Sequence, residues 1–194
     1  QNETLGDNPR LRSTKRGTID ESVKREIPFK NAIVKNQCNT LRMNFSGNYA
    51  VEFRVFDNGM AYRFVTDKKE DNIVMGEDFA INFPANYKAH LSQPDGFKTS
   101  YEYPYTHIDT ENYAATDRMS YLPVLIETDK AYKILISEAD LFDYPCMFLK
   151  GTGKNGMQSL FPKAPLAFGE DGDRSLKITK EADYIAKTTG KRSF

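Results

Sequence analysis

The chain has 194 residues, with 27 basic and 27 acidic side chains and a formal net charge of +0. This length predicts one domain or one elongated sandwich, and the balanced charge argues against nucleic acid as the main partner because phosphate binding needs a basic surplus on one face. The sequence holds no apolar stretch near the roughly 20 residues that a membrane-spanning helix requires, so we expect no such helix.

The start of the chain is polar and charged, and residues 1–27 are therefore expected to form a loose lead-in with at most one short helical turn around residues 20–25. The chain begins with Gln1 and shows no basic stretch followed by an apolar one, so we expect that a signal peptide has been removed or omitted. The last residues, 188–194, suggest a cut, and we expect a fragment of a larger protein.

Residues 51–65 carry the clearest hairpin signal. Two runs in which apolar and polar residues alternate flank the Asn-Gly dipeptide at 58–59, which favours a two-residue type I′ turn because both residues accept a positive φ. That register would place Arg54 opposite Arg63, an unfavourable pair unless a carboxylate such as Glu52 lies between them.

The rest of the chain also shows short runs with a period of two, and no window of 12 or more residues has an apolar stripe at helical spacing. This pattern predicts an all-β fold, an antiparallel β-sandwich with few or no helices, over residues 28–194. The other predicted strands lie at residues 41–45, 73–75, 79–83, 121–127, 132–136, 146–150, 157–160, 175–179 and 184–186.

Several patterns that resemble binding sites are better explained by ordinary structure. Gly-Thr-Gly-Lys at 151–154 lacks the upstream Gly and the Ser or Thr of a phosphate-binding loop, so we expect a hairpin tip. Asp-Gly-Asp at 171–173 begins like a calcium loop but lacks its required Gly, so we expect a turn. Cys38 and Cys146 are expected to be separate free thiols, and no zinc site is expected.

Tyr101, Tyr103 and Tyr105 alternate in an aromatic segment. Flat rings with polar tips suit the faces of sugar rings, so one interpretation is that these tyrosines stack on a carbohydrate. Packing against a neighbouring loop or domain explains the segment equally well, and both interpretations stay open.

His90 and His107 are the only histidines. Because no Ser or Cys nucleophile lies in a recognisable elbow, a catalytic triad is unsupported. A mutarotase-like isomerase on a β-sandwich would need both histidines and a carboxylate to meet on one face. Both histidines lie in turn-rich sequence, so we expect them to lie apart.

Glu138 follows an apolar strand at the point where we expect the strand to end. It shares parity with Tyr132, Ile134 and Ile136, so its carboxylate continues their face. A carboxylate that leaves a buried face needs a cation, a hydrogen-bond donor or a raised pKa. A functional site and an exposed strand end with a surface ion pair both stay open.

Three segments of the chain resemble the N-terminal domain of glycoside hydrolase family 97, in the order found there. Residues 51–64 (VEFRVFDNGMAYRF) are similar to its FRVYxDGxAFRY stretch, residues 136–147 (ISEADLFDYPCM) to its hEAxLxDYxxM stretch, and residues 183–194 to the stretch that enters its catalytic barrel. The resemblance covers residues 28–194. It implies a mutarotase-like supersandwich, followed in the family by a (β/α)8 barrel and a small C-terminal β domain.

The resemblance also implies a function for the larger protein. Family members are exo-acting α-glucosidases or α-galactosidases of Bacteroides-type bacteria, exported to the periplasm or cell envelope, and of the two we expect an α-glucosidase. They use calcium near the substrate. Because the catalytic carboxylates and most calcium-binding glutamates lie in the barrel, we expect no catalytic residue here and one calcium ligand, which by motif is Glu138. This chain alone is expected to bind calcium weakly or not at all.

The expected partners are the missing catalytic barrel and an oligosaccharide substrate, with the sandwich forming part of the wall of the substrate pocket. The alternative is a stand-alone carbohydrate-binding or interaction module, which would bind sugar saturably through Tyr101, Tyr103 or Tyr105. The isomerase is the third interpretation, and it requires His90 and His107 to meet.

Overall fold

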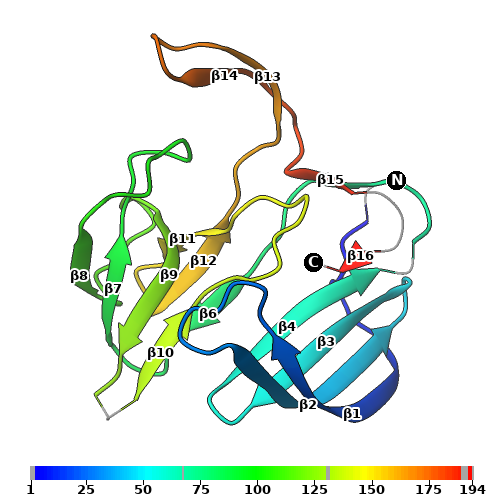
Figure 1. Ribbon diagram of the computed structural model, residues 1–194. Helices are drawn as coiled ribbons and strands as arrows, with labels where there is room; N and C mark the ends of the chain where they lie inside the picture. Colours follow the sequence, from blue (N-terminus) through cyan, green and yellow to red (C-terminus); the bar gives the residue numbers. More distant parts are fainter. Residues whose placement is uncertain (1–2, 67, 130–131, 189–191, 194) are drawn as a thin grey trace. The chain divides into compact units, whose positions relative to one another are not determined.

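The computed structural model describes residues 3–66, 68–129, 132–188 and 192–193, the last two by their backbone alone. These residues form sixteen β-strands and no helix, and the large sheets are antiparallel (Figure 1). The prediction of an all-β, antiparallel fold with few or no helices is confirmed. Within the described residues we find no helix that could cross a membrane.

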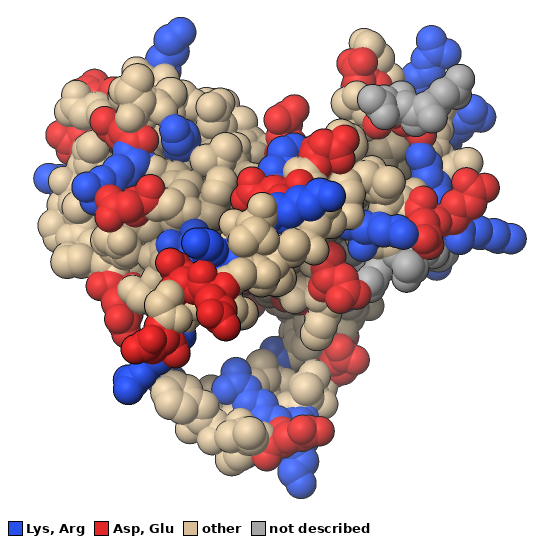
Figure 2. All heavy atoms as spheres, turned by 90° about the horizontal axis from the view of Figure 1, so that it is seen from above, with Lys and Arg blue, Asp and Glu red and all other residues tan. Residues whose placement is uncertain are grey.

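The chain divides into two compact units. Unit 1 comprises residues 1–72 and 189–194, and unit 2 comprises residues 73–188. Lys and Arg side chains are interspersed with Asp and Glu side chains over the face shown in Figure 2, as expected for a chain with a formal net charge of +0.

Unit 1 is one five-stranded sheet in the order β1-β2-β3-β4-β16. Its buried side chains include Tyr49 and Val65, and the rings of Phe45 and Tyr49 stack with their centroids 5.1 Å apart. The strands are β1 Leu11–Lys24, β2 Ile33–Phe45, β3 Tyr49–Phe56, β4 Gly59–Thr66 and β16 Arg192–Ser193.

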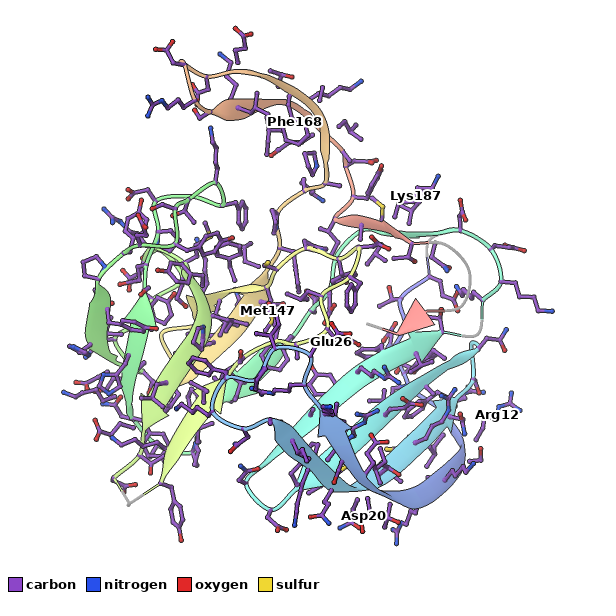
Figure 3. The ribbon with its side chains drawn as sticks, in the orientation of Figure 1. Arg12, Asp20, Glu26, Met147, Phe168 and Lys187 are labelled. Atoms are coloured by element: carbon purple, nitrogen blue, oxygen red, sulfur yellow. The ribbon has the colours of Figure 1, made fainter. Side chains whose placement is uncertain are left out.

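Strand β1 runs through the segment that was expected to be a loose lead-in, so that expectation and the helical turn placed there are wrong. Every side chain of β1 is exposed except that of Ile19, which is partly buried. Figure 3 labels two of its charged side chains, Arg12 and Asp20. Because backbone hydrogen bonds to β2 need no apolar side chains, a polar segment without an apolar face forms a strand here.

The β3–β4 hairpin contains the predicted strands in a different register. Phe56 pairs with Gly59, so the two loop residues are Asp57 and Asn58 rather than the dipeptide at 58–59. The shift removes the expected pair of arginines, because Arg54 now pairs with Ala61. The predicted type I′ turn is therefore wrong, although the hairpin itself is confirmed.

Glu52 lies between two arginines on one face of this sheet. Its carboxylate accepts hydrogen bonds from Arg42 Nη1 at 2.6 Å and from Arg63 Nε at 2.9 Å. Burial raises the pKa of Glu52, but the hydrogen bonds and charges of Arg42 and Arg63 outweigh that effect, and the net pKa is lowered. The carboxylate therefore stays ionised below its ordinary range and joins three strands.

We expect Glu52→Gln to lower the free energy of unfolding by about 1 kcal/mol at pH 7, since a largely surface ion pair is worth little more. A carboxyl whose pKa is lower when folded stabilises the protein above its unfolded pKa, and this stability is lost as pH falls through the folded pKa. The difference between the variants should accordingly shrink in acid. Urea unfolding at pH 7 and at acidic pH measures it, with the exposed Glu26→Gln as control. Equal differences at both pH values would contradict the assignment.

Unit 2 is built on a seven-stranded sheet in the order β6-β12-β11-β9-β7-β8, with β10 paired to β9. Two further pairs, β13-β14 and β5-β15, complete it. The predicted hairpins at 121–136 and 146–160 are confirmed, although Lys130 of the first predicted turn lies outside the described residues. The strands are β5 Asn72–Val74, β6 Ala80–Asn82, β7 Lys88–Ser92, β8 Tyr105–Asp109, β9 Ser120–Glu127, β10 Lys133–Ile136, β11 Phe148–Gly151, β12 Gly156–Leu160, β13 Pro165–Glu170, β14 Leu176–Glu181 and β15 Ala186–Thr188.

Two clusters of buried side chains form the core of unit 2. The smaller one consists of Met119, Tyr121 and Phe148, with Phe97 and Tyr103 packed against it. Burial of these apolar and aromatic surfaces is the main force that holds the sheet to its loops. The larger cluster contains Phe83, Ala89, Leu91, Tyr113, Val124, Ile126, Ile136, Met147, Leu149 and Met157.

Strands β13 and β14 form a hairpin that projects from the rest of unit 2 (Figure 1). We call this hairpin the arm. Its apolar side chains are unusually exposed, with Phe168 and Leu176 each 58% exposed. Figure 3 labels Phe168 on β13. The predicted turn at 171–173 is confirmed as the tip of the arm, where Asp171 N–H donates to the carbonyl of Ser175.

Candidate functional site

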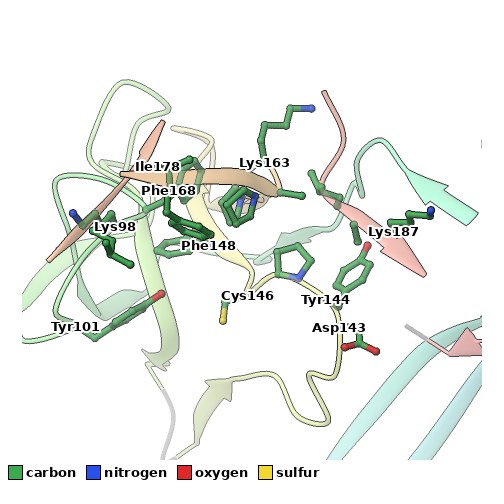
Figure 4. A pocket seen from close by; sticks show the side chains of 18 residues that line it. Lys98, Tyr101, Asp143, Tyr144, Cys146, Phe148, Lys163, Phe168, Ile178 and Lys187 are labelled. Atoms are coloured by element: carbon green, nitrogen blue, oxygen red, sulfur yellow. The ribbon is translucent and has the colours of Figure 1, made fainter. Parts of the chain in front are cut away.

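A cleft of about 610 Å³ opens in unit 2 between the arm and the loops beside the large sheet (Figure 4). The β7–β8 loop, the β10–β11 loop and the start of β11 form one side, and the arm forms the other. Its lining combines aromatic rings with a few charged side chains, a composition typical of ligand sites. The lining includes Lys98, Tyr101, Tyr144, Cys146, Phe148 and Phe168.

Phe148 joins this cleft to the core. It is 1% exposed, and its ring meets Phe97 edge-on with centroids 5.0 Å apart. Tyr101 lies next to it, 6.4 Å from Phe148 and 5.0 Å from Tyr121 by ring centroids. A group of rings held by buried neighbours gives the cleft a rigid aromatic wall.

Tyr101 is held in place by its backbone as well as by its ring. It has a φ of 58°, a left-handed conformation that few non-glycine residues adopt. The hydroxyl of Tyr121 donates to the Tyr101 carbonyl at 2.9 Å, and the Tyr101 N–H donates to Thr99 Oγ1 at 3.3 Å. Strained backbone of this kind persists where surrounding contacts fix it, and such positions cluster at functional sites.

An ion pair ties the arm to the β7–β8 loop. Lys98 Nζ lies 2.9 Å from Asp171 Oδ2 at the tip of the arm. The hydrogen bond from Lys98 and its charge lower the pKa of Asp171. The otherwise projecting arm therefore has a polar contact as well as its apolar side chains.

Glu138 lies in the loop between β10 and β11, two residues after β10 ends. Both carboxylate oxygens accept the backbone N–H of Met147 at 3.0 Å. Burial raises the pKa of Glu138, the hydrogen bond from Met147 lowers it, and the charge of Glu77 raises it again, with a net rise. The carboxylate is thus fixed near a second acid, and a bound cation would favour its ionised form.

The strand face that leads to Glu138 changes from exposed to buried along β10. Tyr132 is 72% exposed, Ile134 is 40% exposed and Ile136 is 9% exposed. The uniformly apolar, buried face expected before Glu138 is therefore only partly present. Glu138 follows the buried end, and burial of its carboxylate raises its pKa.

Tyr144 and Glu77 were not identified from the sequence. The Tyr144 hydroxyl donates to Glu77 Oε2 at 2.8 Å. Burial, followed by the charge and hydrogen bond of Glu77, raises the pKa of Tyr144 far above its ordinary value, and Glu138 adds to the rise. Burial, then Cys146 and Glu138, also raises the pKa of Tyr101. Glu138 thus acts on both tyrosines of the cleft, although it does not itself line the cleft.

The three tyrosines singled out in the sequence do not share one face. Only Tyr101 lines the cleft. Tyr103 packs against the smaller core cluster and its hydroxyl donates to Asp95 Oδ2 at 3.2 Å. Tyr105 lies on β8 and is 53% exposed. The period of two was expected to align them, but the left-handed turn at Tyr101 ends that alternation before β8 begins.

His90 and His107 meet, contrary to the expectation that they lie apart in turns. They are opposite each other on β7 and β8, with their Nδ1 atoms 2.6 Å apart. Glu127 completes the group, with Oε2 3.2 Å from His90 Nε2. The geometric requirement of the isomerase interpretation is met, but none of these residues lines the cleft.

Two further predictions, for the cysteines and for the segment at 151–154, are confirmed. Cys38 and Cys146 are both free thiols, the first buried and the second exposed at the cleft. The segment at 151–154 is a hairpin tip, in which Thr152 N–H donates to the Gly156 carbonyl. Tyr144, Glu77 and β13, the first strand of the arm, were missed, whereas its second strand was predicted at residues 175–179. The alternation in residues 165–170 was the signal for β13.

The chain is similar to known proteins of one enzyme family. A family model for the glycosyl-hydrolase 97 N-terminal region matches residues 1–188. The chain is 31% identical over 202 residues to a retaining alpha-galactosidase of Bacteroides thetaiotaomicron, covering 97% of this chain and 30% of that protein. The chain therefore spans less than a third of the length of that curated relative.

Solved structures share the fold. A glycoside hydrolase family 97 enzyme from Pseudoalteromonas sp. strain K8, in complex with acarbose, matches with a TM-score of 0.75 and 19% identity over 95% of this chain and 26% of that one. A beta-arabinopyranosidase matches with a TM-score of 0.77 and 19% identity over 96% of this chain and 31% of that one. At such identities the likeness shows the fold alone.

Proposed function

The chain belongs to glycoside hydrolase family 97 as its N-terminal domain, and from that premise we propose that it forms one wall of the sugar site of a calcium-dependent, exo-acting α-glycosidase. The observation that carries this proposal is Glu138, a partly buried carboxylate with a raised pKa beside an aromatic cleft. Hydrolysis would need a pair of carboxylates outside this chain. The partners are then the catalytic barrel and an oligosaccharide.

The substrate is a terminal α-glycoside. The relative at 31% identity is a retaining alpha-galactosidase, which supports α-galactosides as the first substrates to test. The solved family 97 enzyme bound to acarbose, together with a variant bound to panose, supports α-glucosides, the preference expected from the sequence. The family resemblance supports a location in the periplasm or cell envelope.

The residues present fit one ligand of a calcium site rather than a whole site. Calcium takes 6–8 oxygen ligands, and the described part of the chain has no group of three or more His, Cys, Asp or Glu side chains that could hold a metal. Glu138 accepts a single N–H, that of Met147, with both oxygens, and an ionised carboxylate has about four lone-pair sites. It therefore keeps the capacity to bind a cation that groups of the barrel also hold.

The test is Glu138→Gln in the full-length enzyme. We expect the calcium concentration that gives half-maximal hydrolysis of 4-nitrophenyl α-galactoside or α-glucoside to rise about tenfold or more, since ligand charge sets calcium affinity. Glu102→Gln, an exposed acid in the β7–β8 loop, is the matched control. An unchanged calcium requirement in Glu138→Gln would contradict the proposal.

The isolated chain gives an independent check. Calorimetric titration with calcium should show no micromolar binding, because most of the ligands are absent from it. Micromolar calcium affinity of the isolated chain would rule out a shared site. Saturable binding of galactose or maltose by the isolated chain, lost in Tyr101→Ala, would favour the stand-alone carbohydrate-binding module instead.

A further inference from the structure

His90, His107 and Glu127 form a polar group on three adjacent strands of the large sheet. His90 on β7 pairs with His107 on β8, and β7 also pairs with β9, which carries Glu127 at its end. The two Nδ1 atoms are 2.6 Å apart, and the imidazole rings meet edge-on at 72°. Strand pairing brings the three side chains together, because His107 lies directly opposite His90 and Glu127, opposite Lys88, lies diagonal to it.

Hydrogen bonds connect the three side chains in a row, from His107 through His90 to Glu127. Lys133, whose Nζ is 2.5 Å from Glu127 Oε1, and then His90 lower the pKa of Glu127. Glu127 Oε2 lies 3.2 Å from His90 Nε2, the ring nitrogen that does not face His107. The Nδ1 atoms of His90 and His107 face each other and share one hydrogen bond.

The pair is open to solvent and separate from the cleft. The side chain of His90 is 21% exposed and that of Glu127 is 43% exposed, and His107 is exposed as well. Two cations flank the group, and each is near a carboxylate: Lys133 faces Glu127, and Lys88 lies 4.0 Å from Asp109. An ion approaching the histidines thus meets no unpaired lysine among these flanking groups.

We propose that His90 and His107 form a transition-metal site of the zinc and copper class, with both Nδ1 atoms as ligands and water at the remaining positions. Glu127 is a positioning residue, which holds the other ring nitrogen of His90, as a carboxylate does for most metal-bound histidines. The metal takes a lone pair from each Nδ1, so the proton of the Nδ1–Nδ1 hydrogen bond is released to solvent on binding.

The two Nδ1 atoms need to move only slightly apart to bind one zinc ion. Zinc–nitrogen bonds of 2.0–2.1 Å at a tetrahedral angle separate two ligand atoms by about 3.3 Å, compared with 2.6 Å between the two Nδ1 atoms here. Rotation of the exposed His107 ring supplies the difference. Imidazole nitrogen favours copper and zinc over calcium, and divalent copper over zinc. With two protein ligands the site agrees with the lack of any three-ligand group in the described residues.

The experiment uses the whole 194-residue chain carrying Cys146→Ser, so that the exposed thiol cannot bind the metal. Calorimetric titration with zinc chloride and with copper(II) chloride, in a buffer that does not coordinate metals, should show saturable one-to-one binding, tighter for copper. Calcium chloride should give none. Glu127→Gln should weaken zinc binding about tenfold at the same stoichiometry, and His107→Ala or His90→Ala should abolish saturation.

Several results would overturn the proposal. One is the absence of saturable zinc binding by the Cys146→Ser chain. Another is a double variant His90→Ala/His107→Ala that binds zinc as tightly as the Cys146→Ser chain does. Unchanged affinity in Glu127→Gln would overturn its positioning role. Circular dichroism checks that each variant folds. If an alanine variant does not fold, the imidazole NMR signals of the Cys146→Ser chain decide: both histidines should respond to one equivalent of zinc, and a response of neither excludes the site. The test does not depend on the proposed glycosidase function.

Discussion

Gly151→Ala is expected to destabilise unit 2 by about 3 kcal/mol or more. A Cβ at this position would lie 1.9 Å from the Tyr113 carbonyl oxygen and 2.5 Å from its Cγ. Tyr113 is fully buried and cannot move aside easily, because its carbonyl accepts from Gly153 and its hydroxyl donates to the Leu149 carbonyl at 2.9 Å. The close approach of two backbones thus requires glycine.

Thermal and urea unfolding followed by circular dichroism measure this effect. Gly96→Ala is the matched control, because Gly96 has no atom within 4 Å of an added Cβ and no positive φ. It should change the free energy of unfolding by no more than about 0.5 kcal/mol. A Gly151→Ala protein as stable as the control would show that β11 and the Tyr113 loop do not meet as described.

Phe148→Ala is expected to cost about 3–5 kcal/mol, as for other buried phenylalanines. The side chain is 1% exposed in the smaller core cluster, and its loss removes the contact with Phe97 and the surface against which Tyr101 lies. The variant therefore tests whether the cleft wall is an extension of the core. Chemical unfolding gives the stability, and hydrogen exchange in the β7–β8 loop reports the loosening.

Phe168→Ala is the matched control for that prediction. Both phenylalanines line the cleft, but Phe168 on the arm is 58% exposed. Its removal leaves no buried cavity, so we expect a stability change of no more than about 0.5 kcal/mol. Equal losses of stability in the two variants would mean that the arm is as much a part of the core as β11.

Much of the strand content could be predicted because short alternating runs between turn residues leave few alternatives. The β3–β4 hairpin shows the limit. Its alternation located both strands, but choosing between a loop at Asp57-Asn58 and one at Asn58-Gly59 required knowing that Glu52 pairs with Arg63. Register depends on such cross-strand partners, which sequence spacing alone does not reveal.

Strands β1, β7 and β8 were missed for different reasons. Strand β1 has almost no apolar face, so hydrophobic periodicity could not detect it. Strands β7 and β8 are only five residues each. They pair with each other across the β7–β8 loop, and β7 also pairs with β9. The pairing of His90 with His107 depends on that same contact, so the meeting of the two histidines could not be predicted from either segment.

The candidate site was predictable in part for a similar reason. Glu138 was identified because parity along one strand is a local property. Tyr144 and Glu77 were not, because their hydrogen bond joins residues 67 positions apart. Tyr101 was separated from Tyr103 and Tyr105 by a left-handed residue that the sequence pattern does not mark.

Strand β1 has a consequence for the behaviour of the protein in concentrated solution. It is an edge strand of its sheet, and fourteen residues of edge backbone are a potential template for aggregation. Its side chains oppose this, because lysine, arginine, aspartate and glutamate follow one another along its length and the pairing is irregular between Leu11 and Ser13. The polar character that concealed the strand in the sequence therefore protects its open edge from the addition of other chains.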